Sequence, residues 1–313
     1  MNAYLLTFAA AAALSLLLTR FCRDVALRFS WVDVPDTARK LHTSPVPVIG
    51  GVALLASTAL ALVVVSLLST FAAERLYSDQ NGVLTLGALC TMMMLVGLAD
   101  DRWSVRPGLK FTLQVAVALA AWLAGIRIES LGTYWQSGLH VGLFSLPITV
   151  LWIVGITNAF NLLDGIDGLS AGAALFATTA MLGVAISSGE TSTALILAAL
   201  AGATVAFLRY NFNPASIFLG DSGSLFLGFT LSVMAVQSSQ KSAAAFAVAV
   251  PIVSLGLPVL DHLIVASRGY FSEAARLYER RLAVLGWIPG MNRIFKEQTV
   301  LDLAGLLEGS GQF

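Results

Sequence analysis

The chain has 313 residues, of which 57% are hydrophobic and only 12% charged, and its formal net charge is zero. This composition excludes an ordinary soluble globular domain, and the balanced charge gives no indication of a nucleic-acid partner. Uncharged apolar runs of about 18 residues are long enough to cross a bilayer as helices. About nine runs approach or exceed that length, over residues 3–19, 48–70, 83–99, 109–125, 145–163, 170–187, 191–208, 223–239 and 244–260.

The sequence therefore predicts an all-α, polytopic integral membrane bundle, since the alternating pattern of a membrane barrel is absent. Lys and Arg in short loops predict which connections face the cytoplasm. Fifteen of the 18 basic residues fall in connections on one side, at 20–47, 100–110, 164–169, 209–222 and from 261 onward. We therefore expect the N-terminus outside and the C-terminal tail in the cytoplasm.

The acidic residues favour the same side of the membrane. Six aspartates fall at the helix ends predicted to be cytoplasmic: Asp100, Asp101, Asp164, Asp167, Asp221 and Asp261. The positive-inside rule concerns Lys and Arg, so it does not account for acids on that face. Their clustering indicates a group that binds a cation.

The first polar segment, DVPDTARKLHTSPVPVIGG (33–51), carries Arg39, Lys40 and His42 and ends in a glycine pair that opens the second helix. A basic cytoplasmic loop is expected by default, so this segment alone is a weak signal. Next to clustered acids it could hold anionic phosphates.

The second segment, GLADDRWSVRPGLK (97–110), places two adjacent carboxylates after one apolar helix and Lys110 at the start of the next. Adjacent carboxylates repel each other unless a proton or a cation offsets their charge. The alternative is a solvated loop with a lysine that reaches out of the membrane. Further along, RIESLGTYWQSGLHVG (127–142) could form a short outer hairpin or lie at the interface.

In the third segment, NAFNLLDGIDGLS (158–170), a polar residue recurs at every third position: Asn158, Asn161, Asp164 and Asp167. On a helix, residues three apart share one face, so these side chains predict a polar ridge. They offer only oxygen ligands, which suit Mg²⁺ rather than Zn²⁺. The alternative is a helix C-terminus with Asn and Gly caps.

The fourth segment, NFNPASIFLGDSGSLFLGF (211–229), sets Asp221 among small residues at the start of a helix. Asp is a good N-cap, and a helix N-terminus is also a natural phosphate site. Phe218 could be a stacking platform or ordinary packing. Together, oxygen ligands, basic residues and a site at the lipid–cytosol boundary point to phosphoryl transfer.

These four segments resemble, in order and spacing over about residues 33–262, the polyprenyl-phosphate N-acetylhexosamine-1-phosphate transferases, members of glycosyltransferase family 4. The resemblance implies a bacterial inner-membrane enzyme with its active site facing the cytoplasm. It would transfer a sugar 1-phosphate from a UDP-N-acetylhexosamine to undecaprenyl phosphate, release UMP and initiate an envelope glycan. It would depend on Mg²⁺, with Mn²⁺ as a substitute. RKLH and PVPVIGG look more like the O-antigen, enterobacterial-antigen or teichoic-acid initiators than the peptidoglycan MurNAc-pentapeptide enzyme.

The resemblance also implies roles for individual residues. Asp221 would be the principal metal ligand, with Asn161 as its partner. Asp100 and Asp101 would either deprotonate the lipid phosphate or organise the metal and the phosphates. Asp164 is counted with Asp100 and Asp101 as catalytic and could touch the nucleotide or the metal. The remaining positions would bind substrate: Lys110 at the pyrophosphate, Asp167 and Phe218 at uracil, Lys40 near the nucleotide, and Asn158 on the same polar ridge.

The last part of the chain departs from the family pattern. Family members carry a late cytoplasmic loop with an HxHH motif, followed by further helices, and neither is found after Asp261. We expect a transmembrane domain over 1–268 and an atypical cytoplasmic or interfacial tail over 269–313, in which Arg276, Arg280 and Arg281 are basic. Two alternatives remain open: an inactive or truncated relative that binds nucleotide-sugar or lipid carrier, and a cation-coupled transporter with acids at mid-bilayer. The sequence leaves a homodimer open.

Overall fold

The computed structural model describes residues 2–33, 45–131 and 139–239. The regular secondary structure of this part of the chain is helical apart from two pairs of very short strands. Its α-helices are α1 (Asn2–Arg28), α2 (Gly50–Leu68), α3 (Thr70–Ser78), α4 (Gln80–Trp103), α5 (Pro107–Leu123), α6 (Ser145–Leu163), α7 (Leu169–Ser187), α8 (Thr191–Asn211) and α9 (Gly220–Ser239), with a 3-10 turn η1 (Gly142–Phe144) before α6. The strands are β1 (Val32–Asp33), β2 (Val46–Pro47), β3 (Ser130–Leu131) and β4 (Leu139–His140).

The prediction of an all-α, polytopic membrane bundle is confirmed for the described residues. Six of their helices are long and apolar enough to cross a membrane, namely α1, α2, α4, α6 with η1, α7 and α8, and α5 is a shorter apolar helix. The run predicted at 223–239 is α9. The ninth predicted run, 244–260, and the domain boundary expected near residue 268 lie outside the described residues.

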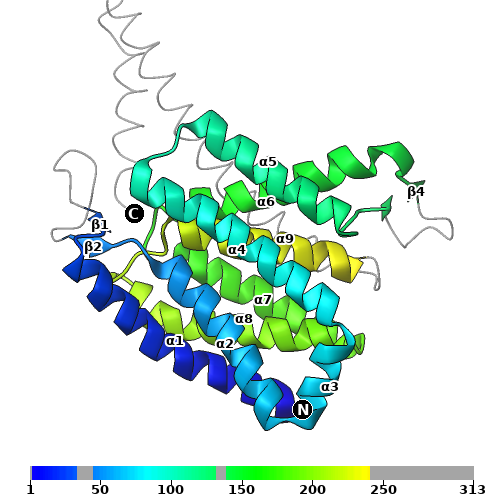
Figure 1. Ribbon diagram of the computed structural model, residues 1–313, viewed down its shortest axis with the longest axis horizontal. Helices are drawn as coiled ribbons and strands as arrows, with labels where there is room; N and C mark the ends of the chain where they lie inside the picture. The colour runs from blue at the N-terminus through cyan, green and yellow to red at the C-terminus, as the bar shows by residue number, and fades with distance from the viewer. Residues whose placement is uncertain (1, 34–44, 132–138, 240–313) are drawn as a thin grey trace, which may run out of the picture. The chain divides into compact units, whose positions relative to one another are not determined.

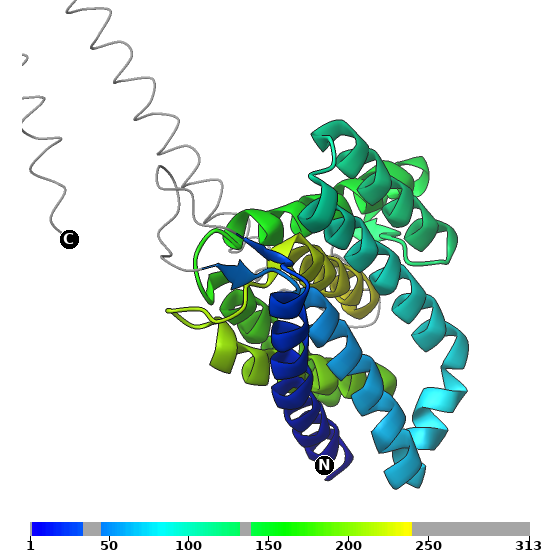
Figure 2. The ribbon, with the colours of Figure 1, turned by 60° about the vertical axis from the view of Figure 1, so that its left-hand side comes forward.

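Helix α9 lies in the interior of the bundle. It packs against α2, α4, α6 and α7, and Figure 1 shows it in yellow among the last three of these. From Leu225 to Val236 its side chains are buried. The N-terminal helix α1 lies beside α2 and α8, as both Figure 1 and Figure 2 show. The first turn of α9 is therefore held by neighbours on several sides.

Glycines let the backbones of two helices approach that first turn. A Cβ added at Gly51 in α2 would lie 2.3 Å from the Gly223 nitrogen. A Cβ added at Gly97 in α4 would lie 2.3 Å from the Asp221 carbonyl oxygen. Small residues allow this approach between membrane helices. The PVPVIGG and GLADD segments thus pack directly against FLGDSG.

Three details differ from, or refine, the expectations from sequence. Helix α1 continues to Arg28, beyond the expected end at residue 19, because helical structure need not stop where the apolar run stops. The short helix α3 was not predicted; the Ser69 side chain caps it by accepting a hydrogen bond from the Ala72 N–H. The connection between α5 and α6 contains the antiparallel pair β3–β4, which agrees with the hairpin alternative.

Candidate functional site

Four segments that are far apart in sequence bring polar side chains together at one end of the bundle. They are the last turn of α4, the first turn of α5, the last turn of α6 and the first turn of α9. The Lys110 ammonium lies 2.8 Å from Asp100 Oδ2 and 2.5 Å from Asp221 Oδ2. The Asn161 amide donates to Asp221 Oδ1 at 2.5 Å. Four of the predicted site residues therefore form one connected network.

The two adjacent aspartates of α4 have different partners. Asp100 faces Lys110, whereas the Asp101 carboxylate accepts hydrogen bonds from the backbone N–H groups of Asp221 at 2.8 Å and Ser222 at 2.9 Å. The first N–H groups of a helix have no partner within the helix, and a carboxylate there also interacts favourably with the helix dipole. Asp101 thus caps α9 from a neighbouring helix.

A glycine makes this cap possible. Gly220 begins α9 with a φ of +71°, a conformation that side-chain-bearing residues rarely adopt. A Cβ at Gly220 would also lie 2.8 Å from Asp101 Oδ2. The glycine before Asp221 in the FLGDSG segment therefore has a structural explanation.

Asp164 lies just beyond α6, in the connection to α7. Burial raises the pKa of its carboxyl well above the ordinary value, and the nearby negative charges of Asp101 and Asp221 raise it further. The Asp164 side chain therefore keeps its proton to a higher pH than a solvated aspartate. Its sensitivity to Asp101 and Asp221 means that it belongs to the same electrostatic neighbourhood.

Asp167 and Phe218 are connected through the loop between α8 and α9. Asp167 Oδ2 accepts hydrogen bonds from the Asn213 side chain at 3.1 Å and from the Ala215 N–H at 3.0 Å. Phe218, later in the same loop, donates its N–H to the Pro47 carbonyl at 2.7 Å. The loop is thus held by the α6–α7 connection on one side and by β2 on the other.

Asn158 faces a residue that the sequence analysis missed. Its amide donates to Gln114 Oε1 at 2.7 Å and to the Val154 carbonyl at 2.8 Å. Gln114 lies inside the apolar run of α5, where it was counted as part of a membrane span. Its spacing of four residues from Lys110, which places both on one helix face, is the signal that could have revealed it.

Lys40 lies outside the described residues, as do Asp261 and the arginines of the tail. The structure therefore leaves their predicted positions open.

The carboxylate and amide oxygens of the described network are ligands that suit a hard divalent cation. No three His, Cys, Asp or Glu side chains gather in a way that could hold a metal ion, as far as the structure describes the chain. Mg²⁺, however, is commonly held by only one or two carboxylates together with waters and substrate phosphates. Oxygens of Asp100, Asp221 and Asn161 already surround one cationic group, because the Lys110 ammonium also donates to Asn161 Oδ1 at 3.4 Å.

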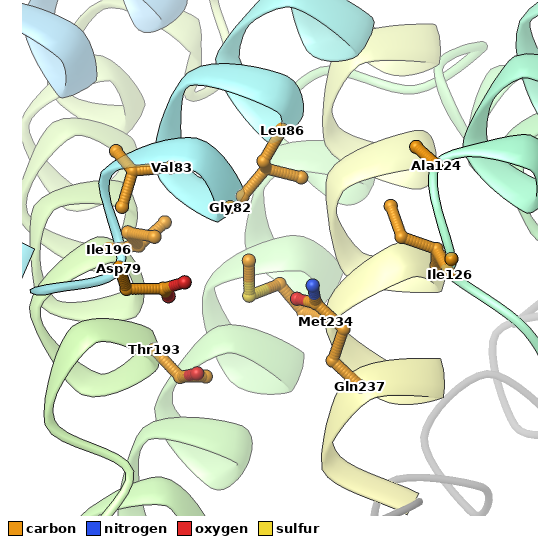
Figure 3. A pocket seen from close by; sticks show the side chains of 11 residues that line it. Asp79, Gly82, Val83, Leu86, Ala124, Ile126, Thr193, Ile196, Met234 and Gln237 are labelled. Atoms are coloured by element: carbon orange, nitrogen blue, oxygen red, sulfur yellow. The ribbon is translucent and has the colours of Figure 1, made fainter.

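A pocket at the other end of α4 has a different character. Figure 3 shows this pocket from close by. It is lined by Asp79, Gly82, Val83, Leu86, Ala124, Gly125, Ile126, Thr193, Ile196, Met234 and Gln237. Asp79 directly precedes the 24-residue α4, whereas Asp100 lies in its last turn, so about 30 Å separates them along the helix. With one acidic and no basic residue in its lining, this pocket lacks the groups for phosphoryl transfer.

The acids of the network lie at helix ends rather than in the middle of membrane spans. Asp100 and Asp101 end α4, and Asp221 is the second residue of α9. A cation-coupled transporter would need such groups near the bilayer midplane. This placement disfavours the transporter alternative.

Comparison with known proteins gives consistent matches. The family described as glycosyl transferase family 4 matches residues 83–239, which include all four segments of the network. A probable undecaprenyl-phosphate N-acetylglucosaminyl 1-phosphate transferase of Bacillus subtilis is 32% identical over 248 residues, or 79% of this chain and 66% of that protein. A decaprenyl-phosphate N-acetylglucosaminephosphotransferase of Mycobacterium tuberculosis is 30% identical over 297 residues, or 84% of this chain and 72% of that protein.

A peptidoglycan-type relative also matches. The phospho-N-acetylmuramoyl-pentapeptide-transferase of Streptococcus equi subsp. zooepidemicus is 31% identical over 222 residues, or 66% of this chain and 63% of that protein. The chain thus spans slightly less than two thirds of the length of the Bacillus and Streptococcus relatives.

Proposed function

The chain belongs to glycosyl transferase family 4, and from this premise we propose that it transfers a sugar 1-phosphate from a UDP-N-acetylhexosamine to undecaprenyl phosphate, releasing UMP. The names of the relatives support a polyprenyl-phosphate acceptor and an N-acetylated sugar. One observation carries the proposal: Asp100, Lys110, Asn161 and Asp221 meet at one end of the bundle. That arrangement suits a reaction between a soluble nucleotide-sugar and a lipid phosphate.

In this reaction an oxygen of the acceptor phosphate attacks the β-phosphorus of the UDP-sugar. The bond between that phosphorus and the bridging oxygen breaks, and UMP leaves with the bridging oxygen. The second pKa of a phosphate monoester is about 6, so the acceptor is largely ionised at neutral pH and needs no strong base. Catalysis then depends on positioning and on neutralising charge.

Among the described residues, Lys110 places a cation at this site. We assign it to the diphosphate, where its ammonium offsets negative charge as the attacking oxygen approaches. Asp100, 2.8 Å away, holds the ammonium in place. Asp101 supports the site by capping α9, which keeps Asp221 in position.

Asp221 and Asn161 would hold Mg²⁺, with Mn²⁺ as a substitute and Asp100 nearby. The bound ion would neutralise charge on the diphosphate. The support for this assignment is the chemistry of the donor set, which consists of carboxylate and amide oxygens around one cationic position.

The uracil site is assigned to Asp167 and Phe218. Asp164 is assigned a catalytic role at the nucleotide or the metal, Asn158 binds substrate, and Lys40 lies near the nucleotide. The α8–α9 loop that carries Phe218 is fixed by Asp167, which supports their acting together. Binding of uracil at Asp167 would compete with its hydrogen bonds to this loop.

The active site is proposed to face the cytoplasm of a bacterial inner membrane, because UDP-sugars are soluble there and the basic loops favour that side. RKLH and PVPVIGG favour initiation of an O-antigen-like glycan, and the relatives include both N-acetylglucosamine and muramoyl-pentapeptide enzymes. The sugar must therefore be found by experiment.

The test is release of UMP by the purified protein with undecaprenyl phosphate. UDP-N-acetylglucosamine, other UDP-N-acetylhexosamines and UDP-MurNAc-pentapeptide are supplied in turn, with Mg²⁺ or EDTA. We expect Mg²⁺-dependent UMP with one donor. Asp221→Ala should abolish turnover and weaken Mg²⁺-dependent UDP binding, whereas Asp79→Ala, at the other end of α4, should leave both unchanged. No UMP from folded protein that binds UDP would refute the activity and favour an inactive relative.

A further inference from the structure

We propose that Gln114 is a positioning residue: its buried hydrogen bond with Asn158 fixes α5 against α6 and so places Lys110 between Asp100 and Asp221. The catalytic consequence rests on the proposed function, but the structural consequence can be tested without it.

Helix α5 contacts the bundle through a narrow face. Its outward side chains are exposed, including Phe111 at 56% and Leu123 at 71%. Beyond Gln114, the buried face consists of small or medium apolar residues, Val117, Ala118 and Ala121. Such a smooth face gives little resistance to sliding or rotation of the helix, because neighbouring registers bury similar groups. Directional contacts are needed to select one register. Trp122 Nε1 donates one to Ser145 Oγ at 3.3 Å at the far end of α5, and a second is needed near Lys110.

The Gln114–Asn158 pair supplies that contact directly beneath the catalytic network. Gln114 follows Lys110 by four residues, so both lie on one face of α5, about 6 Å apart along the axis. Asn158 precedes Asn161 by three residues on one face of α6. Two cross-helix contacts are therefore stacked: Lys110 to Asn161 at 3.4 Å, and one turn deeper, Asn158 to Gln114 at 2.7 Å.

The energetics favour a role in geometry over a role in stability. Gln114 is 0% exposed, and its Nε2 has no hydrogen-bond partner among the described residues. A buried donor without a partner is unfavourable, and an apolar residue of similar volume often serves stability as well or better. Buried polar residues in helical interfaces can instead select one register at the expense of stability.

A change of register would disrupt the site. Sliding α5 by one residue moves it about 1.5 Å along its axis and corresponds to a rotation of about 100°. Lys110 could not then keep both carboxylate contacts, at 2.8 Å and 2.5 Å. A misplacement of about 1 Å can lower a catalytic rate by about 100-fold.

The first test compares Gln114→Leu with Thr112→Leu, a control on the exposed side of α5. We expect kcat of Gln114→Leu to fall about 10- to 100-fold, with KM for the UDP-sugar and the melting temperature little changed. Gln114→Asn should be impaired because its side chain is one methylene shorter. A Gln114→Asn protein with the kcat of the wild type would count against a register contact.

The second test requires no turnover. The rate at which Lys110 is acylated by an amine reagent is followed by mass spectrometry. In the wild type this side chain is 14% exposed and paired with two carboxylates, so it should react slowly. Gln114→Leu should accelerate acylation of Lys110 severalfold, and Thr112→Leu should not. Unchanged labelling in Gln114→Leu would overturn the inference whatever the activity shows, whereas absence of UMP from the wild type would count only against the proposed function.

Discussion

Replacing Asp101 by alanine should loosen the first turn of α9. The substitution removes the acceptor for two backbone N–H groups, those of Asp221 and Ser222. Loss of an N-cap destabilises by about 0.5–2 kcal/mol, and each buried N–H left without a partner by about 1–3 kcal/mol. Because the two estimates overlap, we expect a loss of about 2–4 kcal/mol. At about 2–4 °C per kcal/mol, the melting temperature should fall by roughly 4–16 °C.

The chain offers a direct assay for this loss. Cys90 is buried and Cys22 is half-buried, so a thiol-reactive fluorophore reports unfolding in detergent. Asp101→Asn keeps one acceptor oxygen and should fall between the wild type and Asp101→Ala. Asp24→Ala is the matched control, since that side chain is 47% exposed and its loss should change stability by less than about 0.5 kcal/mol.

Activity should follow stability across these variants if Asp101 acts as a cap. Its substitution displaces Asp221, so Mg²⁺-dependent UDP binding should weaken in proportion to the fall in melting temperature. The reasoning would be refuted by an Asp101→Asn protein that melts like the wild type but is as inactive as Asp101→Ala. That result would mean that the carboxylate takes part in the chemistry directly.

Three further substitutions have defined outcomes. Asp167→Ala should raise KM for the UDP-sugar more than for the lipid acceptor; equal changes in steady-state kinetics would contradict a uracil contact. Asp164→Asn should raise the melting temperature above the unfolded-state pKa of about 3.9 and lose this advantage below it, because burial raises the folded-state pKa; a gain independent of pH would contradict this. Gly97→Ala should destabilise the protein, since its Cβ would meet the Asp221 carbonyl, whereas Gly87→Ala on the same helix meets nothing within 4 Å and should be neutral or stabilising.

The sequence predicted the membrane helices well because the bilayer imposes one simple requirement on each of them. Apolar length located the six described candidate spans, and also the helices α5 and α9, without knowledge of their partners. The same criterion missed α3, which is short, and the extension of α1 through Arg28, which is polar. Both errors arise because helix bounds were predicted from hydropathy, whereas local backbone hydrogen bonding determines where a helix begins and ends.

The residues of the site could be chosen from sequence, but their contacts could not. Asp100 and Asp101 were treated as a pair, yet successive helical residues point about 100° apart, so they reach different partners. Gln114 was overlooked because one amide barely changes the hydropathy of a run. Which donors reach Asp101, and which acceptor Asn158 reaches, depends on how α5, α6 and α9 pack, which no single segment specifies.

The wide spacing of the network along the chain also determines the order in which it is made. Asp100 and Lys110 emerge from the ribosome close together, so their charges can neutralise each other as soon as α4 and α5 enter the bilayer. Asp221 follows Lys110 by 111 residues, which takes about 5–20 s of translation. During that interval the lysine first has Asp100 alone and then gains Asn161 when α6 is made, so the nascent protein holds an incomplete site until α9 follows. Truncated chains that end before α9 should therefore insert with the Asp100–Lys110 pair formed, but with Asp101 lacking its partners in α9, and they should remain incapable of catalysis.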